Sequence, residues 1–280
     1  MAQNTALSLP VSHHDLLLSH FRAAHDVLLA EQDLSPRNPK INSCLSAFVA
    51  AVLDCHCHDT CDLLAMPEVV SKRDAILPKL AQAEYEMEKF FALDFAAQDV
   101  LTDADLDHFI YRDNYVELVA EEIDAARTAN VLPDDRPIVF VGAGPLPFSA
   151  IDMHKQTGLK MICIDSDADA VALSRKMIAA LGMQDSIDVV QSSGEDFDYS
   201  GAGLVMVAAL VSAKDNVLAR VRDTAPGVGL AVRSAEGVRT LLYEQADEHA
   251  LDRAGYDYAG KSRITDTIIN TTLFFQPRPV

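Results

Sequence analysis

A glycine turn after a short apolar run is the first stretch of this chain whose residue types could bind a small molecule. Residues 138–141 are β-branched or aromatic, and they lead directly into Gly142-Ala143-Gly144. The first glycine permits a tight turn, and the second lets a ligand approach the main chain closely. This pattern of strand, turn and helix predicts a nucleotide-like ligand at the carboxyl edge of a parallel sheet.

Prolines after the turn narrow the choice of ligand. Pro145 and Pro147 each lack a backbone N–H, so the turn and the following helix offer few amide donors to a phosphate. An adenosine that carries an amino-acid tail, such as S-adenosylmethionine (SAM), fits better than a dinucleotide does. The SAM contacts predicted here are Gly142, Ala143, Gly144, Pro145 and Leu146.

Residues after the next strands extend this predicted SAM site. Asp165 ends the second strand about 20 residues after the turn, where a carboxylate can bind both ribose hydroxyls. Residues 192–196 follow the third strand and would lie over the adenine, although they could equally form a polar surface turn. Asp167 could cap the next helix instead of touching the ligand. The remaining predicted SAM contacts are Ser166, Glu195, Ala208 and Leu210.

An acidic run comes earlier in the chain, at Glu84-Tyr85-Glu86-Met87-Glu88. Glu84 and Glu88 share one helix face at i, i+4 spacing, beside Phe91. A carboxylate so placed can take a proton from a nucleophile, whereas a charge run on a helix is more often a solvated face. The pattern alone leaves both interpretations open.

Two tyrosines and an arginine are further candidates. Tyr111 and Tyr115 also stand at i, i+4 spacing, although aromatic residues so spaced belong more often to a core than to a site. Arg233 ends the fifth strand. Its charge is therefore expected at the carboxyl edge of the sheet, where ligands bind.

The segment Cys55-His56-Cys57-His58, with Cys61, carries the residue types of a metal site. Thiolate and imidazole are ligands that suit zinc. However, adjacent residues point in different directions, and no second Cys/His pair completes a closed site. We prefer partly buried cysteines with surface histidines, and we predict no metal site.

Composition and charge limit the class of protein. The chain has 280 residues, 49% of them hydrophobic, and a formal net charge of −19. Such a charge repels nucleic acid and anionic membranes, so neither is expected as a partner. The sequence shows no membrane-spanning run, no signal-peptide pattern and an odd number of cysteines, five. We expect a cytoplasmic protein without a disulfide framework, for which a homodimer is possible.

The elements that must position these residues change character near residue 130. Before it, the patterns are helical only, at 14–32, 41–53, 69–98 and 103–127, and Pro78 starts or kinks a helix. After it, strands are expected at 138–141, 160–164, 187–190, 204–208, 228–232 and 268–275, with helices between them. The sequence thus predicts an α/β chain: an all-helical N-terminal domain (1–130), then a Rossmann-like, doubly wound SAM-binding domain (131–280) with a parallel sheet.

Together these motifs resemble the nicotianamine synthase family over nearly the whole chain. Residues 141–149 nearly repeat the signature loop of the family, and residues 109–115 resemble its Phe-Pro-Tyr-Tyr-x-Asn-Tyr block. Residues 233–239, with Leu242-Tyr243, are similar to its Arg-Ser-Ala-His-Gly-x-Arg run. Shorter matches are residues 34–36, 41–42, 208–211 and 269–270.

The resemblance implies that the 3-amino-3-carboxypropyl (aminobutyrate) group of SAM moves to an amine, with methylthioadenosine released and no metal required. It implies Glu88 and Tyr115 as catalytic residues, with Glu84 beside them, projecting over SAM from the helical half. The acceptor amine is protonated at neutral pH, so a nearby oxygen must take its proton. Substrate contacts are expected at Tyr111, Arg233 and Asn270.

Two positions depart from the family pattern. Arg112 replaces a tyrosine of the block, and Glu236 replaces the histidine of the Arg-Ser-Ala-His run. With the short chain, these changes resemble the bacterial members that make opine-type metallophores of the staphylopine and pseudopaline kind. That resemblance implies one transfer onto histidine, and a product that passes to an opine-type dehydrogenase.

Other functions stay open at this point. A true nicotianamine synthase would use SAM alone, and an ordinary SAM methyltransferase would use the helical half as a cap over its substrate. A metal-binding or regulatory protein without enzymatic activity would use residues 55–61. The by-product separates the enzymes, because aminobutyrate transfer releases methylthioadenosine and methyl transfer releases S-adenosylhomocysteine.

Overall fold

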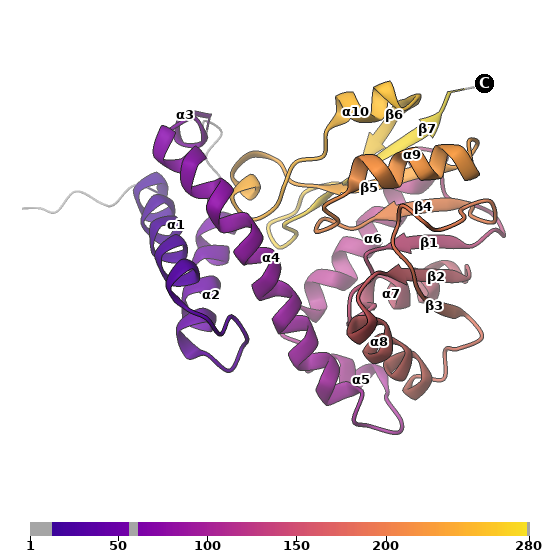
Figure 1. The fold of residues 1–280 in the computed structure, drawn as a ribbon, viewed down its shortest axis with the longest axis horizontal. Helices are drawn as coiled ribbons and strands as arrows, with labels where there is room; N and C mark the ends of the chain where they lie inside the picture. Colours follow the sequence, from indigo (N-terminus) through magenta and orange to yellow (C-terminus); the bar gives the residue numbers. More distant parts are fainter. Residues whose placement is uncertain (1–12, 56–60, 279–280) are drawn as a thin grey trace, which may run out of the picture.

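The structure is a computed structural model that describes residues 13–55 and 61–278. Its first half is helical: α1 (His13–Ala30), α2 (Pro39–Leu53), α3 (Cys61–Leu64), α4 (Pro67–Phe95), α5 (Asp103–Leu106) and α6 (Arg112–Thr128). Helix α4 runs from α3 down to α5, with α1 and α2 on its outer side and the sheet on its inner side (Figure 1).

Apolar residues at helical spacing hold the first helices together. Leu17, Phe21, Ala24 and Leu28 form one fully buried face of α1. They pack with α2, with the first half of α4 and with the 3-10 helix η1 (Gly237–Leu241), which comes from the second half of the chain. The helices expected at 14–32 and 41–53 thus form with small shifts at their ends.

Two expectations for the helical half need correction. Pro78 does not start a helix, because α4 continues through it, and a kink at Pro78 stays a prediction. The single helix expected at 103–127 is wrong, because the short α5 is followed by a turn and then by α6. This turn places Tyr111 at the N-cap of α6, where the backbone leaves the helical conformation.

The second half forms a seven-stranded sheet with the strand order β3-β2-β1-β4-β5-β7-β6. The first five strands are parallel, whereas β7 runs antiparallel to β5, and β6 runs antiparallel to β7. The strands are β1 (Ile138–Val141), β2 (Met161–Asp165), β3 (Ile187–Gln191), β4 (Leu204–Val207), β5 (Gly229–Ser234), β6 (Tyr256–Lys261) and β7 (Thr271–Pro277).

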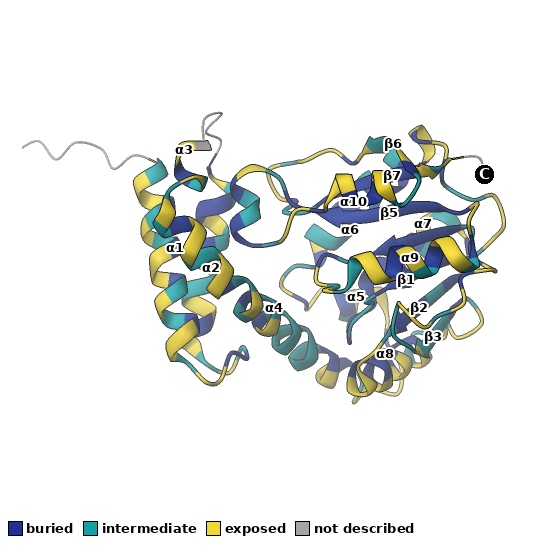
Figure 2. Cartoon of the chain, turned by 45° about the horizontal axis from the view of Figure 1, so that its top comes forward, coloured by how far each residue is buried: buried dark blue, intermediate teal, exposed yellow. Residues whose placement is uncertain are grey.

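Helices cover both faces of the sheet, because successive strand residues point to opposite sides. Phe140 packs on the face covered by α6 and α7 (Phe148–Thr157), with α8 (Ala168–Ala180) beside them. Val139 packs on the other face, against α9 (Lys214–Thr224) and α10 (Glu248–Arg253). In Figure 2 the central strands of the sheet are buried between these helices, whose outer faces are largely exposed. The expected Rossmann-like α/β fold with a helical N-terminal region is confirmed.

The C-terminal edge of the sheet differs from the sequence expectation. β6 and α10 were not predicted. Half of β6 is exposed and Tyr256 is its one buried residue, so no apolar run marks this strand. The last strand begins at Thr271 rather than at residue 268. The division into two domains at residue 130 stays a prediction, since one hydrophobic cluster contains residues of α4, of α6 and of the sheet.

Candidate active site

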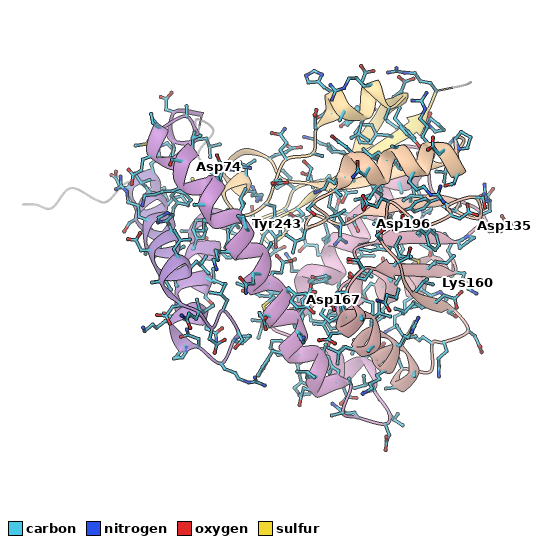
Figure 3. The ribbon with its side chains drawn as sticks, in the orientation of Figure 1. Asp74, Asp135, Lys160, Asp167, Asp196 and Tyr243 are labelled. Carbon is cyan, nitrogen blue, oxygen red and sulfur yellow. The ribbon has the colours of Figure 1, made fainter. Side chains whose placement is uncertain are left out.

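The carboxyl ends of the parallel strands open into one pocket between the sheet and α4. The pocket has a volume of about 930 Å³, and residues of α2 and α6 complete its walls. Asp167 and Tyr243 mark the side of the sheet half that faces α4, whereas Asp135 and Lys160 lie at its far end (Figure 3).

The pocket brings together nearly all of the predicted site residues. They are Glu84, Glu88, Tyr111, Tyr115, Gly142, Ala143, Gly144, Leu146, Asp165, Ser166, Glu195, Ala208, Leu210, Arg233 and Asn270. Pro145 is buried and does not line the pocket, whereas Pro147 does. The loop at 192–195 also lines it, so this loop is not merely a surface turn.

The conformation of the turn explains both of its glycines. Gly142 and Gly144 have φ values of 76° and 67°, in the left-handed region that glycine adopts without strain. A Cβ atom on Gly144 would lie 2.7 Å from Oε2 of Glu88, and one on Gly142 would lie 2.6 Å from Cγ2 of Val211. The carboxylate of Glu88 therefore sits directly against the main chain of the turn.

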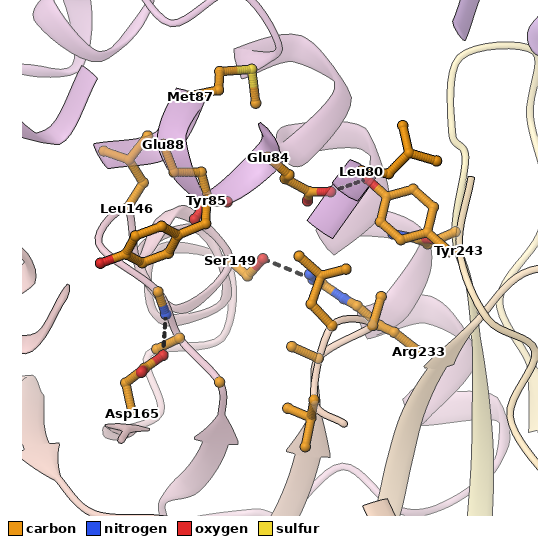
Figure 4. A pocket seen from close by; sticks show the side chains of 18 of the residues that line it. Leu80, Glu84, Tyr85, Met87, Glu88, Leu146, Ser149, Asp165, Arg233 and Tyr243 are labelled. Atoms are coloured by element: carbon orange, nitrogen blue, oxygen red, sulfur yellow. Dashed lines mark hydrogen bonds between the residues drawn. The ribbon is translucent and has the colours of Figure 1, made fainter. Parts of the chain in front are cut away.

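Asp165 holds the glycine turn in place through hydrogen bonds to its carboxylate. Its Oδ2 accepts a hydrogen bond from the N–H of Gly144 over 2.9 Å, and its Oδ1 accepts one from the N–H of Asp167 over 2.9 Å (Figure 4). Each oxygen keeps a lone pair for a ligand hydroxyl. Asp167 itself caps α8 by accepting from the N–H of Ala170 over 2.9 Å, which confirms its capping role.

Two carboxylates of α4 each accept a hydrogen bond from a tyrosine. The Tyr115 hydroxyl donates to Oε1 of Glu88 over 2.9 Å, and the Tyr243 hydroxyl donates to Oε2 of Glu84 over 2.6 Å. Figure 4 shows Glu84 and Glu88 on one side of α4, directed toward the pocket. These two carboxylates therefore belong to the pocket wall and not to a solvated face.

Burial changes the ionisation of these groups. It raises the pKa of Glu88 to about 8, and the neighbouring Glu84 adds to the rise, while the hydrogen bond from Tyr115 opposes it. Burial likewise raises the pKa of Glu84, against the hydrogen bond from Tyr243. Burial is also the main reason why the pKa values of Tyr115 and Tyr243 lie well above the usual value. Both phenols are therefore neutral hydrogen-bond donors at physiological pH.

Arg233 is the only cation among the described residues that line the pocket. Glu122 of α6 binds its guanidinium twice, from Nε to Oε1 over 2.9 Å and from Nη2 to Oε2 over 3.1 Å. Nη2 also donates to Oγ of Ser149 over 2.7 Å, and the guanidinium stacks 5.1 Å from the ring centre of Phe140. The side chain is thus fixed on three sides.

Sequence reasoning did not find Glu122, Ser149 or the role of Tyr243. Glu122 carried a usable signal, because it is a lone carboxylate within the apolar stripe of α6 that contains Leu118, Val119, Ile123 and Ala126. Tyr243 reaches Glu84 across 159 sequence positions, and no local pattern indicates such a contact.

The two departures from the family pattern lie outside the pocket. Arg112 forms a two-bond ion pair with the buried Asp152, and its guanidinium stacks 5.0 Å from the ring centre of Phe148. Glu236 pairs with Lys261 over 2.8 Å at the surface. Neither residue lines the pocket, so these substitutions do not select an acceptor by direct contact.

Most of the Cys/His segment lies outside the described residues, since positions 56–60 are not among them. Cys55 is buried. Within residues 13–55 and 61–278, no three His, Cys, Asp or Glu side chains are grouped so as to hold a metal ion. No helix of these ranges combines the length and the apolar character that crossing a membrane requires.

The fold and the pocket define a Rossmann-like protein whose helical half covers the carboxyl edge of the parallel sheet. The chain belongs to the nicotianamine synthase family: the family described as nicotianamine synthase protein matches residues 12–279. Nicotianamine synthase 3 of Oryza sativa subsp. indica is 28% identical over 272 residues, which cover 88% of this chain and 74% of that protein. The membership confirms the family resemblance, and with it the expectation of an enzyme.

Solved structures show the same fold. A crystal structure of MtNAS in complex with MTA and tNA has a TM-score of 0.77 at 20% identity, and covers 94% of this chain and 98% of that one. A mutant of MtNAS in complex with S-adenosylmethionine has a TM-score of 0.76 at 20% identity, with coverage of 93% and 98%.

We expect Gly144→Ala to destabilise the protein more than a backbone effect alone does. Strain at positive φ costs about 1–2 kcal/mol, and the contact with Glu88 adds to it. Gly158→Ala is the matched control, because Gly158 has φ 73° and a Cβ atom added there would meet nothing within 4 Å. Urea unfolding should show a larger loss of unfolding free energy for Gly144→Ala than for Gly158→Ala. In a Glu88→Ala background, measured against Glu88→Ala alone, the loss caused by Gly144→Ala should fall to the control value. Equal losses for both alanine variants would contradict the close approach.

Glu88→Gln should stabilise the protein at alkaline pH. The pKa of Glu88 is raised from 4.5 to about 8 in the folded chain, so folding favours the protonated carboxyl. This contribution to stability is fully present below pH 4.5 and is lost as the pH rises through 8. Glutamine does not titrate. Because Glu88 is only partly buried, which weakens the effect, we expect a gain of about 1–2 kcal/mol at pH 9 and little difference at pH 4. Urea unfolding at both pH values measures it, and a gain that does not depend on pH would contradict the raised pKa.

Proposed function

We propose that this chain transfers the aminobutyrate group of SAM to the amino group of an amino acid, histidine, and releases methylthioadenosine. The observation that carries the proposal is the position of the Glu88 carboxylate, which accepts a hydrogen bond from Tyr115 and lies against the glycine turn. Membership of the nicotianamine synthase family supports the reaction class. The SAM and MTA in the complexes of MtNAS support SAM as the donor.

The turn and Asp165 would hold the adenosine part of SAM. Asp165 has lone pairs left on both oxygens after it binds the N–H groups of Gly144 and Asp167, and these can accept from the two ribose hydroxyls. Glu195 and its loop would lie beside the adenine, with Ala208 and Leu210 on the other side of the turn. The amino-acid tail of SAM would then extend toward α4.

Transfer of this group is a displacement at carbon. The sulfonium activates three carbons, and the one that faces the nucleophile reacts, so placement decides between methyl and aminobutyrate transfer. The acceptor nitrogen forms a bond to the chain carbon attached to sulfur, the C–S bond breaks, and its electron pair stays on sulfur as a neutral thioether. The amine must lose a proton, and Glu88 takes it.

The raised pKa of Glu88 suits this role. A carboxyl with a pKa of about 8 is close in basicity to the amine that it must deprotonate. A SAM cation bound beside it would lower the pKa and ionise the carboxyl when the donor is in place. Tyr115 would keep the carboxylate oriented through its hydrogen bond.

The acceptor would lie between α4 and the segment before β7. The pocket volume of about 930 Å³ is near the top of the range for small-molecule sites and leaves room beside one SAM. Oδ1 of Asn270 is buried and has no hydrogen-bond partner among the described residues, so we assign Asn270, with Tyr111, to the acceptor. Histidine is the acceptor proposed for this space, and its product would pass to an opine-type dehydrogenase.

A second candidate function is nicotianamine synthesis from SAM alone. The names of the plant relatives favour it, because Nicotianamine synthase 3 of rice matches 88% of this chain. In that reaction the aminobutyrate of further SAM molecules would occupy the acceptor space.

Incubation with SAM and a panel of amino acids, followed by mass spectrometry, tests the reaction. We expect one aminobutyrate group on histidine and an equal amount of methylthioadenosine. Nicotianamine formed from SAM alone would replace the first proposal by the second. S-adenosylhomocysteine as the by-product would refute both, because it marks methyl transfer.

Glu88→Gln should lower turnover by about 10²–10⁴, which is the usual contribution of a general base, while SAM affinity changes little. The loss should shrink at high pH, where free amine is abundant. Glu84→Gln is the control, since Glu84 lies one turn away and is bonded to Tyr243, and its loss should be smaller. Stopped assays across pH 6–10 measure both variants. Turnover of Glu88→Gln near that of the unchanged protein at neutral pH would exclude Glu88 as the base.

A further inference from the structure

The guanidinium of Arg233 has one edge to which the described residues form no hydrogen bond. Nε and Nη2 donate to Glu122 and Ser149, but Nη1 has no hydrogen-bond partner in the described part of the chain. Arg233 nevertheless lines the pocket (Figure 4). A guanidinium presents five N–H donors in a fixed plane, so fixing two nitrogens also fixes the direction of the third.

Glu122 fixes the direction of Nη1 through its two hydrogen bonds with the guanidinium. It is fully buried, and besides Arg233 it accepts a hydrogen bond from the hydroxyl of Thr272 over 2.5 Å. A buried ion pair adds little to stability compared with apolar residues of the same size. The pair therefore calls for another explanation, and the free Nη1 edge supplies one.

The charges of the pocket show what this edge would bind. Glu84, Glu88, Asp165 and Glu195 are the acids that line the pocket, and Arg233 is the only cation among its described lining residues, so Arg233 is the group there that attracts an anion. Under the proposed function, both the donor and the acceptor carry an α-carboxylate and an α-ammonium. Glu84 projects from α4 at the same end of the pocket as Arg233, so that end holds a carboxyl group and a guanidinium (Figure 4).

We propose that Glu122 is a positioning residue that holds Arg233 with Nη1 open to the pocket, so that Arg233 binds the α-carboxylate of an amino-acid substrate. The inference rests on the proposed function. The carboxylate belongs either to the aminobutyrate part of SAM or to the acceptor, and each source has its own arm of the test.

The donor arm compares SAM with decarboxylated SAM by calorimetry, without an acceptor. The acceptor arm compares the KM of histidine with that of histamine, which lacks the carboxylate. A charge-assisted hydrogen bond lost with the carboxylate should weaken one of these pairs by about 10–100-fold in the unchanged protein. In Glu122→Gln that difference should fall below about threefold, because the glutamine amide opposes the Nη2 donor and turns the guanidinium away.

The matched control is Asp152→Asn. Asp152 and Arg112 form an equally buried two-bond pair that does not line the pocket. This variant should lose stability and yet keep the full discrimination against the ligand without a carboxylate. Loss of discrimination in Asp152→Asn would mean that general loosening, not the position of Arg233, explains the effect.

A second variant covers the case in which Glu122→Gln does not fold. Glu122→Leu combined with Arg233→Met replaces the pair by apolar side chains of similar size, which proteins commonly tolerate. It should bind both members of the affected pair of ligands equally. Full discrimination in either variant, or none in either arm for the unchanged protein, would overturn the inference. If calorimetry shows discrimination but no product forms, the proposed function fails while the role of Arg233 stands.

Discussion

The contact between Glu88 and the glycine turn is the constraint on which the rest of the structure depends. A helix from the first half of the chain places a carboxylate against the main chain of a turn from the second half, and no side chain fits between them at Gly144. Several contacts hold α4 there. Ala92 and Phe95 pack in the same hydrophobic cluster as the sheet, and Lys89 pairs with Asp169 at the start of α8 over 2.8 Å.

The same placement creates an electrostatic problem that the surrounding residues solve. Two carboxylates one helical turn apart are partly buried, which disfavours their charged forms. Each carboxylate accepts a hydrogen bond from a neutral phenol, Glu88 from Tyr115 and Glu84 from Tyr243. The ion pair between Arg233 and Glu122 adds no net charge to the pocket. The pocket can therefore take a cationic ligand, while the raised pKa of Glu88 reduces the charge of that carboxyl near neutral pH.

Sequence reasoning found what local patterns encode. Four of the five parallel strands are continuous or nearly continuous buried runs, and glycine marks the turn after the first of them. It failed where long-range contacts decide. Edge strand β6 has no alternation to detect, the pairing of Glu84 with Tyr243 joins distant segments, and Arg112 belongs to a family motif although its side chain turns away from the pocket. A motif fixes a position along the chain, but packing fixes the direction of the side chain.

The 3-10 helix η1 has a consequence for how the protein is made. Val238, Leu241 and Leu242 complete the hydrophobic cluster of α1, α2 and the first half of α4. Synthesis proceeds from the N-terminus, so these helices leave the ribosome long before their last packing partners do. The first helices to be made are therefore among the last to complete their core, and the nascent chain must keep that apolar surface from other partners until residues near 240 emerge.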